Sequence, residues 1–560
     1  MSTAALKPAS DTSADAPAKP PPTPQKRGVR FWLIIAGLSI TGLLVALEAT
    51  IVSTALPSII ADLGGADSYV WVIMAYFLTM TSFQPLYGQL ADIFGRRYLT
   101  ILAVAIFTLG SGLCGGADNL NMMIAGRAIQ GLGGSGINVL VELIICDIIP
   151  LRERGTFMGI IFGAITLGTA LGPLFAGLIV EYSTWRWVFY LNLPVAGVAL
   201  VVLTLFLQVK YDRKLSIGQS LKRIDYFGNA LFIASCVSTL IALGWAGTVY
   251  PWSSFRILVP LILGFAGFAA FLFYEGSRFA VEPIMPLHLF KNRTSSAVFI
   301  ITFFHSLASV WVLYFMPVYF QGVRMSTPAR SGVQLLPTVV VMIPFGGIGG
   351  KLLEKYGKYK PIHLAAFAIM VIGYGLLTLL DENSSTAEWV IFQIVESIGF
   401  GLILAALLPA LQAKLSEADS ASSTATWGFI RAFGMVWGSI IPSSIFNNRF
   451  DQLAGRISDV AIREQLSGGH AYEHATKAFV SALPTANGVR DQVISVFSDS
   501  LKRTWQIGIT FVGLGFLFVF MEEQVELRKD LETEYGLDEK VFKDEEKDSA
   551  ATEPRGKAEK

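Results

Sequence analysis

Two ionisable residues inside apolar segments are the clearest candidates for chemistry in this chain. Glu48 lies within the apolar run that begins near Phe31, and Arg127 lies near the start of the run that begins near Leu120. A carboxylate surrounded by hydrocarbon is costly to keep charged, so it tends to hold a proton until water reaches it. Glu48 could therefore load and release a proton if two conformations expose it differently. The alternative is a permanently hydrogen-bonded Glu48 that braces helix contacts.

Arg127 cannot lose its proton at any useful pH. Inside an apolar helix it needs a carboxylate, backbone carbonyls or water as a partner, and Gln130, one turn further on, could share that partner. The alternative is an arginine whose long side chain extends to the outer interface. Gln130 and four other polar residues in apolar runs could line a cavity or could instead be satisfied helix contacts, which is the commoner role of a lone histidine. The four are His305, Gln393, Glu396 and Arg431.

A short charged turn occurs twice, each time between two apolar runs. Residues 88–97 read GQLADIFGRR and residues 350–358 read GKLLEKYGK, at an offset of 350 − 88 = 262 residues. The aligned pairs are Gly88 with Gly350, Asp92 with Glu354, Gly95 with Gly357 and Arg96 with Lys358. Glycines let helix ends approach and turn sharply, and Asp92 can pair with a neighbouring arginine, Arg96 or Arg97. Such a repeat indicates a transporter built from two related halves.

The elements that position these residues are predicted to be membrane-spanning helices. Of the 560 residues 53% are hydrophobic and only 15% are charged, whereas soluble domains carry about 25% charged residues. Apolar runs of about 20 residues, the length that crosses a bilayer, are expected to begin near fourteen positions. These are Phe31, Tyr69, Tyr98, Leu120, Gly155, Trp187, Asp225, Arg256, Ser295, Gly332, Pro361, Ala387, Ser422 and Thr504. We therefore predict an all-α polytopic membrane protein with about fourteen spans.

Several functional classes are disfavoured by the sequence. A net charge of +1 argues against a nucleic-acid partner, and the three cysteines have no metal-ligand spacing. The glycine-rich stretch 131–136 lies within an apolar run instead of following a strand, so a nucleotide site is not expected. We find no catalytic constellation and expect neither an enzyme nor a bound metal or cofactor.

The distribution of lysine and arginine predicts the orientation. The loops 61–68, 115–119 and 247–255 hold neither residue, whereas the alternate loops are basic; both termini should therefore lie in the cytosol. Asn383 begins an Asn-Ser-Ser sequence on an outer loop and is a candidate for glycosylation. The expected organisation is a disordered tail (1–30), a six-helix bundle (31–209), a cytosolic linker (210–224), two inserted helices (225–274), a second six-helix bundle with a long outer loop at 446–500 (275–522), and a charged cytosolic tail (523–560).

The turn at 88–97 resembles the signature loop of the major facilitator superfamily. Residues 47–57 resemble the first-helix motif of its fourteen-helix drug:proton antiporters, and residues 127–131 resemble the fourth-helix motif. Residues 185–194 and 245–252 are similar to the fungal members of this branch. The fifth-helix antiporter motif is matched, with Ala176 where a glycine is usual, by Gly159, Gly168, Gly172, Pro173 and Gly177. The alternative for this run is generic close helix packing with a proline kink.

The resemblance implies the major facilitator fold, in which two six-helix bundles alternate access to a midplane site. It also implies proton coupling through Glu48, where the family more often has aspartate, and Arg127. The loops at 88–97 and 350–358 would hold the inner ends together. The expected function is proton-driven export of a small amphipathic drug, toxin or secondary metabolite, by a monomer in the plasma membrane or else the vacuolar membrane. The alternatives are uptake of siderophores or basic amino acids, and a non-transporting membrane sensor.

Overall fold

The computed structural model describes residues 28–63, 70–209, 216–246, 250–280, 282–485 and 488–528. These residues are almost entirely helical, and Ala246 and Tyr250 form an isolated β-bridge. The all-α prediction is therefore confirmed. The expected tails lie mostly outside the described residues, as does the 210–215 part of the linker.

The first half of the chain forms a bundle of eight helical segments. They are α1 (Val29–Leu63), α2 (Val70–Ser82), α3 (Gln84–Phe94), α4 (Arg96–Gly115), α5 (Leu120–Ile148), α6 (Leu151–Tyr182), α7 (Arg186–Tyr190) and α8 (Asn192–Phe206). A short helix, α9 (Ile217–Lys222), then precedes the two inserted helices α10 (Tyr226–Trp245) and α11 (Phe255–Glu275).

The second half repeats the plan and adds a small cap of short helices. Its main helices are α12 (Arg293–Val318), the short α13 (Pro328–Gln334), α14 (Leu336–Tyr356), α15 (Lys360–Leu377), α16 (Thr386–Gln412), α17 (Ser420–Leu453) and α21 (Val489–Val519). The cap consists of α18 (Val460–Leu466), α19 (Ala471–His474) and α20 (Lys477–Ala482). Short segments of other helix types lie elsewhere in this half, at Leu287–Phe290, Tyr319–Val323, Glu417–Asp419 and Ala454–Arg456.

Among the described residues, twelve helices are long and apolar enough to cross a membrane, and Trp71–Ser82 is a shorter apolar helix. All but one of the fourteen expected starts lie within about four residues of an observed helix start. The exception is the last one. The segment 446–500, expected to be a long outer loop, is helical at both ends, because α17 runs on to Leu453 and α21 begins already at Val489.

Polar side chains fix where several of these helices begin. The Asn119 side chain accepts a hydrogen bond from the Met122 amide at the start of α5, and Ser385 forms a capping box with Glu388 at the start of α16. Such caps satisfy amides that have no partner within the helix. The helix bodies between the caps are apolar on most sides, as helices in lipid must be.

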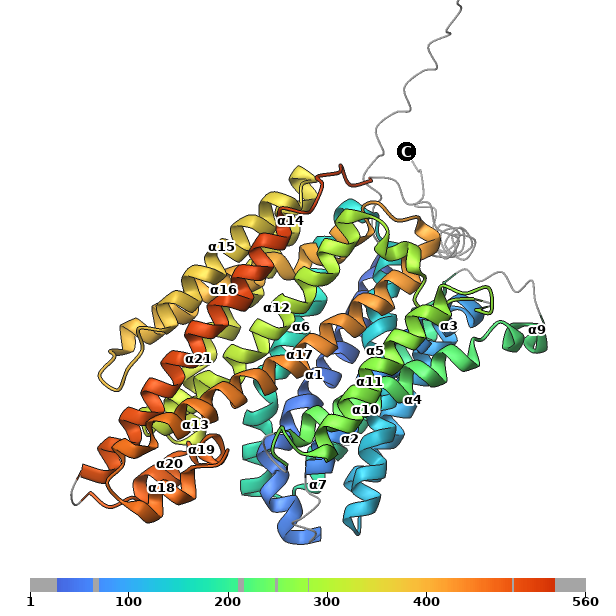
Figure 1. Ribbon diagram of the computed structural model, residues 1–560. Helices are drawn as coiled ribbons and strands as arrows, with labels where there is room; N and C mark the ends of the chain where they lie inside the picture. The colour runs from blue at the N-terminus through green and yellow to red at the C-terminus, as the bar shows by residue number, and fades with distance from the viewer. Residues whose placement is uncertain are drawn as a thin grey trace, which may run out of the picture.

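The two halves converge at one end of the molecule and diverge towards the other (Figure 1). We call the converging end, where α1 begins and α21 ends, the terminal face, and the opposite end the far face. Helix α6 crosses α14 very closely at the terminal face: a Cβ atom on Gly350 would lie only 2.4 Å from the Gly155 carbonyl oxygen. Gly88 of α3 likewise lies against Ala425 of α17. Glycine is therefore what allows the halves to meet here.

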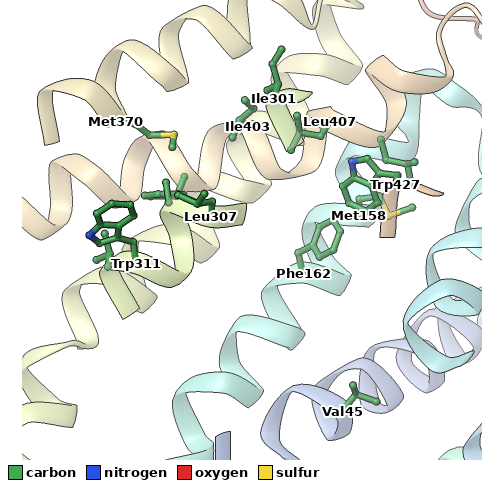
Figure 2. Close-up of a cluster of buried hydrophobic side chains, with 14 of the residues drawn as sticks. Val45, Met158, Phe162, Ile301, Leu307, Trp311, Met370, Ile403, Leu407 and Trp427 are labelled. Atoms are coloured by element: carbon green, nitrogen blue, oxygen red, sulfur yellow. The ribbon is translucent and has the colours of Figure 1, made fainter. Parts of the chain in front are cut away.

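Below this closure, apolar side chains fill the interface between the two halves, which we call the seam. Phe162 and Met158 of α6 lie beside Trp427 of α17, close to Leu407 of α16 (Figure 2). The inserted helices are attached to both halves: Trp245 of α10 contacts Trp71 of α2, with ring centroids 5.8 Å apart, and Phe232 contacts Phe429 of α17 at 4.8 Å. The two added helices thus pack against the seam from one side.

Candidate functional site

A buried ion pair joins the two residues that the sequence singles out. Arg127 Nη1 lies 2.5 Å from Glu48 Oε1, and the two side chains are 1% and 0% exposed. The side-chain amide of Asn192 donates to the other carboxylate oxygen, also at 2.5 Å. Three helices of the first half, α1, α5 and α8, therefore meet at one carboxylate. Arg127 does not extend to an interface, so that alternative is wrong.

Arg127 makes further hydrogen bonds within the same half. Its Nε donates to the Val72 carbonyl at 2.9 Å and its Nη1 to Gln130 Oε1 at 2.7 Å. The guanidinium also lies 4.3 Å from the centre of the Tyr76 ring. Gln130 in turn donates to Ser111 Oγ at 2.8 Å. A buried pair is tolerated only when its other polar atoms are bonded in this way.

The sequence did not single out Asn192 or Ser111. Asn192 belongs to the motif at 185–194, whose resemblance pointed to a family and not to a contact with Glu48. Ser111 lies in an apolar helix, where serine commonly bonds to its own backbone. Only the helix arrangement brings the two residues to the pair.

A second buried ion pair crosses the seam. Arg431 Nη2 of α17 lies 2.5 Å from Glu142 Oε1 of α5, with 11% and 2% of the side chains exposed. The Arg431 guanidinium lies 4.4 Å from the Trp427 ring centre and 5.2 Å from that of Phe162. The sequence marked Arg431 as a candidate cavity residue but did not indicate its partner.

The other three candidate cavity residues contact their own half. Gln393 accepts from Thr338 Oγ1 at 3.0 Å and donates to the carbonyls of Gln334 and Trp389. The His305 imidazole lies 3.3 Å from the Phe400 carbonyl oxygen. Glu396 accepts from the neighbouring Ser397 hydroxyl at 3.0 Å and is buried against α15 at Gly373. The helix-contact interpretation fits Gln393 and His305.

The first charged turn is held by pairs within its own half. Arg96 lies 3.0 Å from Asp92 and 2.8 Å from Asp147, and it also donates to the Ala91 carbonyl. Gly95 connects α3 to α4 with φ = 84°, a conformation that favours glycine. Arg97 points away and donates to the Thr204 carbonyl at 2.7 Å. Asp92 therefore orients Arg96, while Gly88 makes the contact with the second half.

The second charged turn contacts the first half directly. Arg152 of α6 donates to the carbonyl oxygens of Glu354 and Lys355 at 2.8 and 2.9 Å, and the Thr156 hydroxyl donates to the Glu354 carboxylate. Gly357 ends α14 in the left-handed conformation, with φ = 64°. The two turns thus occupy corresponding places but make different contacts.

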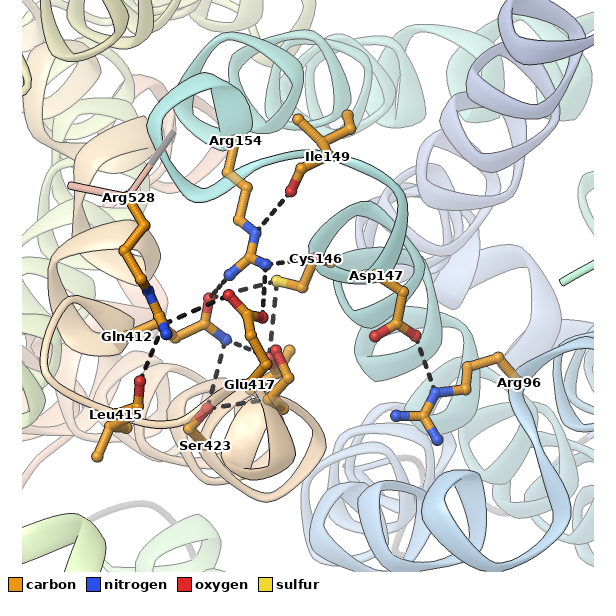
Figure 3. Close-up of polar contacts among 12 residues, drawn as sticks. Arg96, Cys146, Asp147, Ile149, Arg154, Gln412, Leu415, Glu417, Ser423 and Arg528 are labelled. Carbon is orange, nitrogen blue, oxygen red and sulfur yellow. Dashed lines mark hydrogen bonds and ion pairs between the residues drawn. The ribbon is translucent and has the colours of Figure 1, made fainter. Parts of the chain in front are cut away.

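A polar network next to these turns also joins the halves (Figure 3). Arg154 of α6 donates to Gln412 Oε1 at 2.8 Å and pairs with Glu417 at 2.9 Å, both in the second half. Arg528, beyond α21, lies 3.3 Å from Glu417 and donates to the Leu415 carbonyl. The sequence indicated none of these pairs, because their members are more than 100 residues apart.

The glycines of the fifth-helix motif pack against two different helices. Added Cβ atoms on Gly168 and Gly172 would lie 2.4 and 3.0 Å from the carbonyl oxygens of Leu43 and Leu47 in α1. Gly159 lies against Gly346 of α14, whereas no atom lies within 4 Å of the position of a Cβ on Gly177. The Pro173 side chain lies outside the described part of the structure. Close packing therefore holds for three of the four glycines.

At the far face, an exposed ion pair ties the end of α1 to α7. Asp62 lies 2.8 Å from Arg186 Nη1 and accepts a bond from Trp185 Nε1 at 3.0 Å. The hydrogen bonds from Arg186 and Trp185 hold the pKa of Asp62 below its usual range.

Asn383 lies on the exposed turn between α15 and α16, where its backbone amide donates to the Asp381 carboxylate.

The chain has close relatives among known proteins. A family profile described as Major Facilitator Superfamily matches residues 38–439. The MFS-type transporter pydD of an Acremonium species is 56% identical over 518 residues, which cover 92% of this chain and 90% of that protein. The MFS-type efflux pump LUC4 of a Fusarium species is 45% identical over 529 residues, with 94% of each chain covered. The solved structure of the proton:xylose symporter XylE matches with a TM-score of 0.55 at 14% identity, over 87% of this chain and 95% of that one.

Proposed function

Because the chain belongs to the major facilitator superfamily, we propose that it is a proton-coupled transporter that exports a small amphipathic organic compound by alternating access. Glu48 carries the proton, and Arg127 and Asn192 hold the Glu48 side chain in place. Relatives at 45% identity and above include proteins named as efflux pumps, which supports export. The cargo is a drug-like compound, toxin or secondary metabolite.

One observation carries the proton-coupling step: the Glu48 carboxylate is completely buried, yet it is bonded to a cation and to a neutral amide. The pair is charge-neutral with Glu48 ionised and carries one positive charge when Glu48 is protonated. Protonation therefore weakens the attraction to Arg127 and frees α1 to move relative to α5. Helix α1 also packs on α6 through Gly168 and Gly172, so a shift of α1 reaches the helix that contacts the second half.

We propose that the terminal face lies in the cytosol, on the distribution of lysine and arginine in the loops. The halves meet at that face, so this conformation is the one closed towards the cytosol. Export then requires the contacts of Gly155 with Gly350 and of Arg154 with Gln412 to open while cargo enters. The transporter acts as a monomer in the plasma membrane, with both termini inside.

The direct test measures accumulation of a fluorescent amphipathic dye in cells that lack their own export pumps. Cells that carry the protein should hold less dye, and a protonophore should abolish the difference. A difference that survives the protonophore would contradict proton coupling. Unchanged accumulation, together with faster entry of labelled siderophore or lysine, would contradict export and favour uptake.

A further inference from the structure

The Glu48–Arg127 and Glu142–Arg431 ion pairs differ in where they lie. The Glu48–Arg127 pair is contained in the first half, and its atoms are bonded to several neighbours. The Glu142–Arg431 pair connects the first half to the second. Arg431 Nη1 is buried and has no hydrogen-bond partner among the described residues. The second pair is thus the less completely satisfied of the two, and it lies where the halves must separate.

Opening the terminal face must break this second pair. Arg431 is eleven residues from the start of α17 at Ser420, which places it about 16 Å along the helix from that face. The seam between Glu142 and Arg431 therefore lies deeper than the contact of Gly155 with Gly350, on the path that opening would expose. Once the pair separates, the Arg431 guanidinium faces the opened path without the Glu142 carboxylate, so an anion that enters can take the place of that carboxylate.

The surroundings of Arg431 fit an anionic aromatic ligand. Trp427 and Phe162 flank the guanidinium, at 4.4 and 5.2 Å, and their own ring centroids are 6.2 Å apart. Figure 2 shows both rings at the seam between α6 and α17. A planar guanidinium binds a carboxylate through two parallel hydrogen bonds, and aromatic rings beside it supply apolar area for the rest of the ligand. Phe162 and Trp427 come from opposite halves, so they also separate on opening.

We propose that Arg431 binds the anionic group of an amphipathic aromatic cargo when the terminal face is open, and that Glu142 replaces this group when the face closes. This inference rests on the proposed export function and specifies its cargo class, organic anions such as carboxylates. Closure brings the Glu142 carboxylate to 2.5 Å from Arg431, so the cargo anion loses its partner and leaves towards the far face. The guanidinium thus has an anionic partner in both conformations, the cargo when the path is open and Glu142 when it is closed.

The test uses two probes that differ in one charge, 1-pyrenebutyrate and its methyl ester, with purified protein in nanodiscs and equilibrium dialysis as the readout. We expect the acid to bind at least about tenfold more tightly than the ester, since one charged hydrogen-bonded contact is worth about 1.4 kcal/mol or more. Arg431→Gln should abolish this preference without weakening ester binding, and Arg431→Lys should keep part of it. Glu142→Gln should bind the acid more tightly than the wild type and export it more slowly.

Matched controls are Arg503→Gln on the exposed side of α21 and Glu464→Gln on the exposed side of α18, which should leave both affinities unchanged. Equal affinity of the wild type for acid and ester, no binding of the acid, or equal losses for both probes in Arg431→Gln would overturn the proposal. The comparison of acid and ester with the wild type needs no variant, so poor folding of a mutant cannot explain a negative result. Charge-selective binding without export in cells would contradict the export function and leave the anion site standing.

Discussion

At the residue scale, the proposed proton coupling depends on Glu48. Its carboxylate is bonded to Arg127 and Asn192, which come from helices 79 and 144 residues further along the chain. Such a carboxylate can act as a proton carrier, because gain of a proton changes the net charge of the Glu48–Arg127 pair from zero to +1. The bracing and proton-carrying interpretations predict different consequences when the charge alone is removed.

Glu48→Gln should reduce proton-driven export at least about tenfold while Glu48→Asp retains part of it, because only the aspartate can still take up a proton. The glutamine variant leaves Arg127 buried without a counter-ion, and breaking a buried pair costs about 3–5 kcal/mol. Export must therefore be compared at equal amounts of folded, monodisperse protein. Equal loss in both variants would favour a purely bracing role.

Asp62 offers a pH-dependent test outside the membrane. Its pKa is lowered in the folded state by the hydrogen bonds from Arg186 and Trp185, so its stabilising contribution is present above the unfolded pKa of about 3.9. The contribution is lost as pH falls through the lower folded pKa. Asp62→Asn should therefore melt below the wild type at pH 6, and the two melting temperatures should converge as pH falls below the lowered pKa of the folded state. A constant difference across this range would contradict the assignment; Asp491→Asn, on an exposed position of α21, is the control.

At the element scale, the sequence predicted where most helices lie but not which residues of different helices contact one another. Runs of apolar residues locate α1 and α5, because any segment that crosses lipid must be apolar and internally hydrogen-bonded. The end of α17 and the start of α21 were missed, since both extend past the apolar region as polar helix, with Asn447, Arg449 and Asp499 among their residues. The pairing of Glu142 with Arg431 depends on how the halves pack, which no local pattern records.

Gly350 tests whether the crossing of α6 and α14 closes the terminal face. Gly350→Val places a side chain 2.4 Å from the Gly155 carbonyl, and overpacking of this kind costs about 1–3 kcal/mol. The ratio of closed to open protein should fall by roughly 5- to 150-fold. This should increase maleimide labelling of a Thr156→Cys variant when the reagent is added from the terminal-face side. Gly347→Val on the same helix meets no atom within 4 Å and should label like the wild type; identical labelling of the two valine variants would contradict the closure.

At the scale of the whole molecule, the segment after α21 holds the halves together at the terminal face. Glu522 is fully buried and lies 2.7 Å from His363 Nδ1. The amide of Glu523 donates to Thr294 Oγ1 at 3.1 Å, and the Arg528 carbonyl accepts from the amide of Arg152 in the first half. The closed conformation thus uses contacts from both repeats and from the end of the described chain.

Truncation after Met521 should therefore lower the melting temperature and increase opening at the terminal face, because it leaves His363 buried without its partner and removes the Arg528 contacts. Truncation after Arg528 retains all of these bonds and is the matched control. Melting curves and maleimide labelling of the purified proteins would check both effects. Similar behaviour of the two truncations would contradict a role for residues 522–528.

The most direct test of the central claim is cargo-dependent proton movement in proteoliposomes that contain the wild type or Glu48→Gln at equal density. A pH-sensitive dye inside the vesicles reports protons, and the fluorescent cargo reports transport. We expect cargo that moves out of the vesicles to drive protons inward with the wild type, and we expect Glu48→Gln to abolish this coupled flux. The same cargo-dependent proton flux in both proteins would show that Glu48 is not the proton carrier.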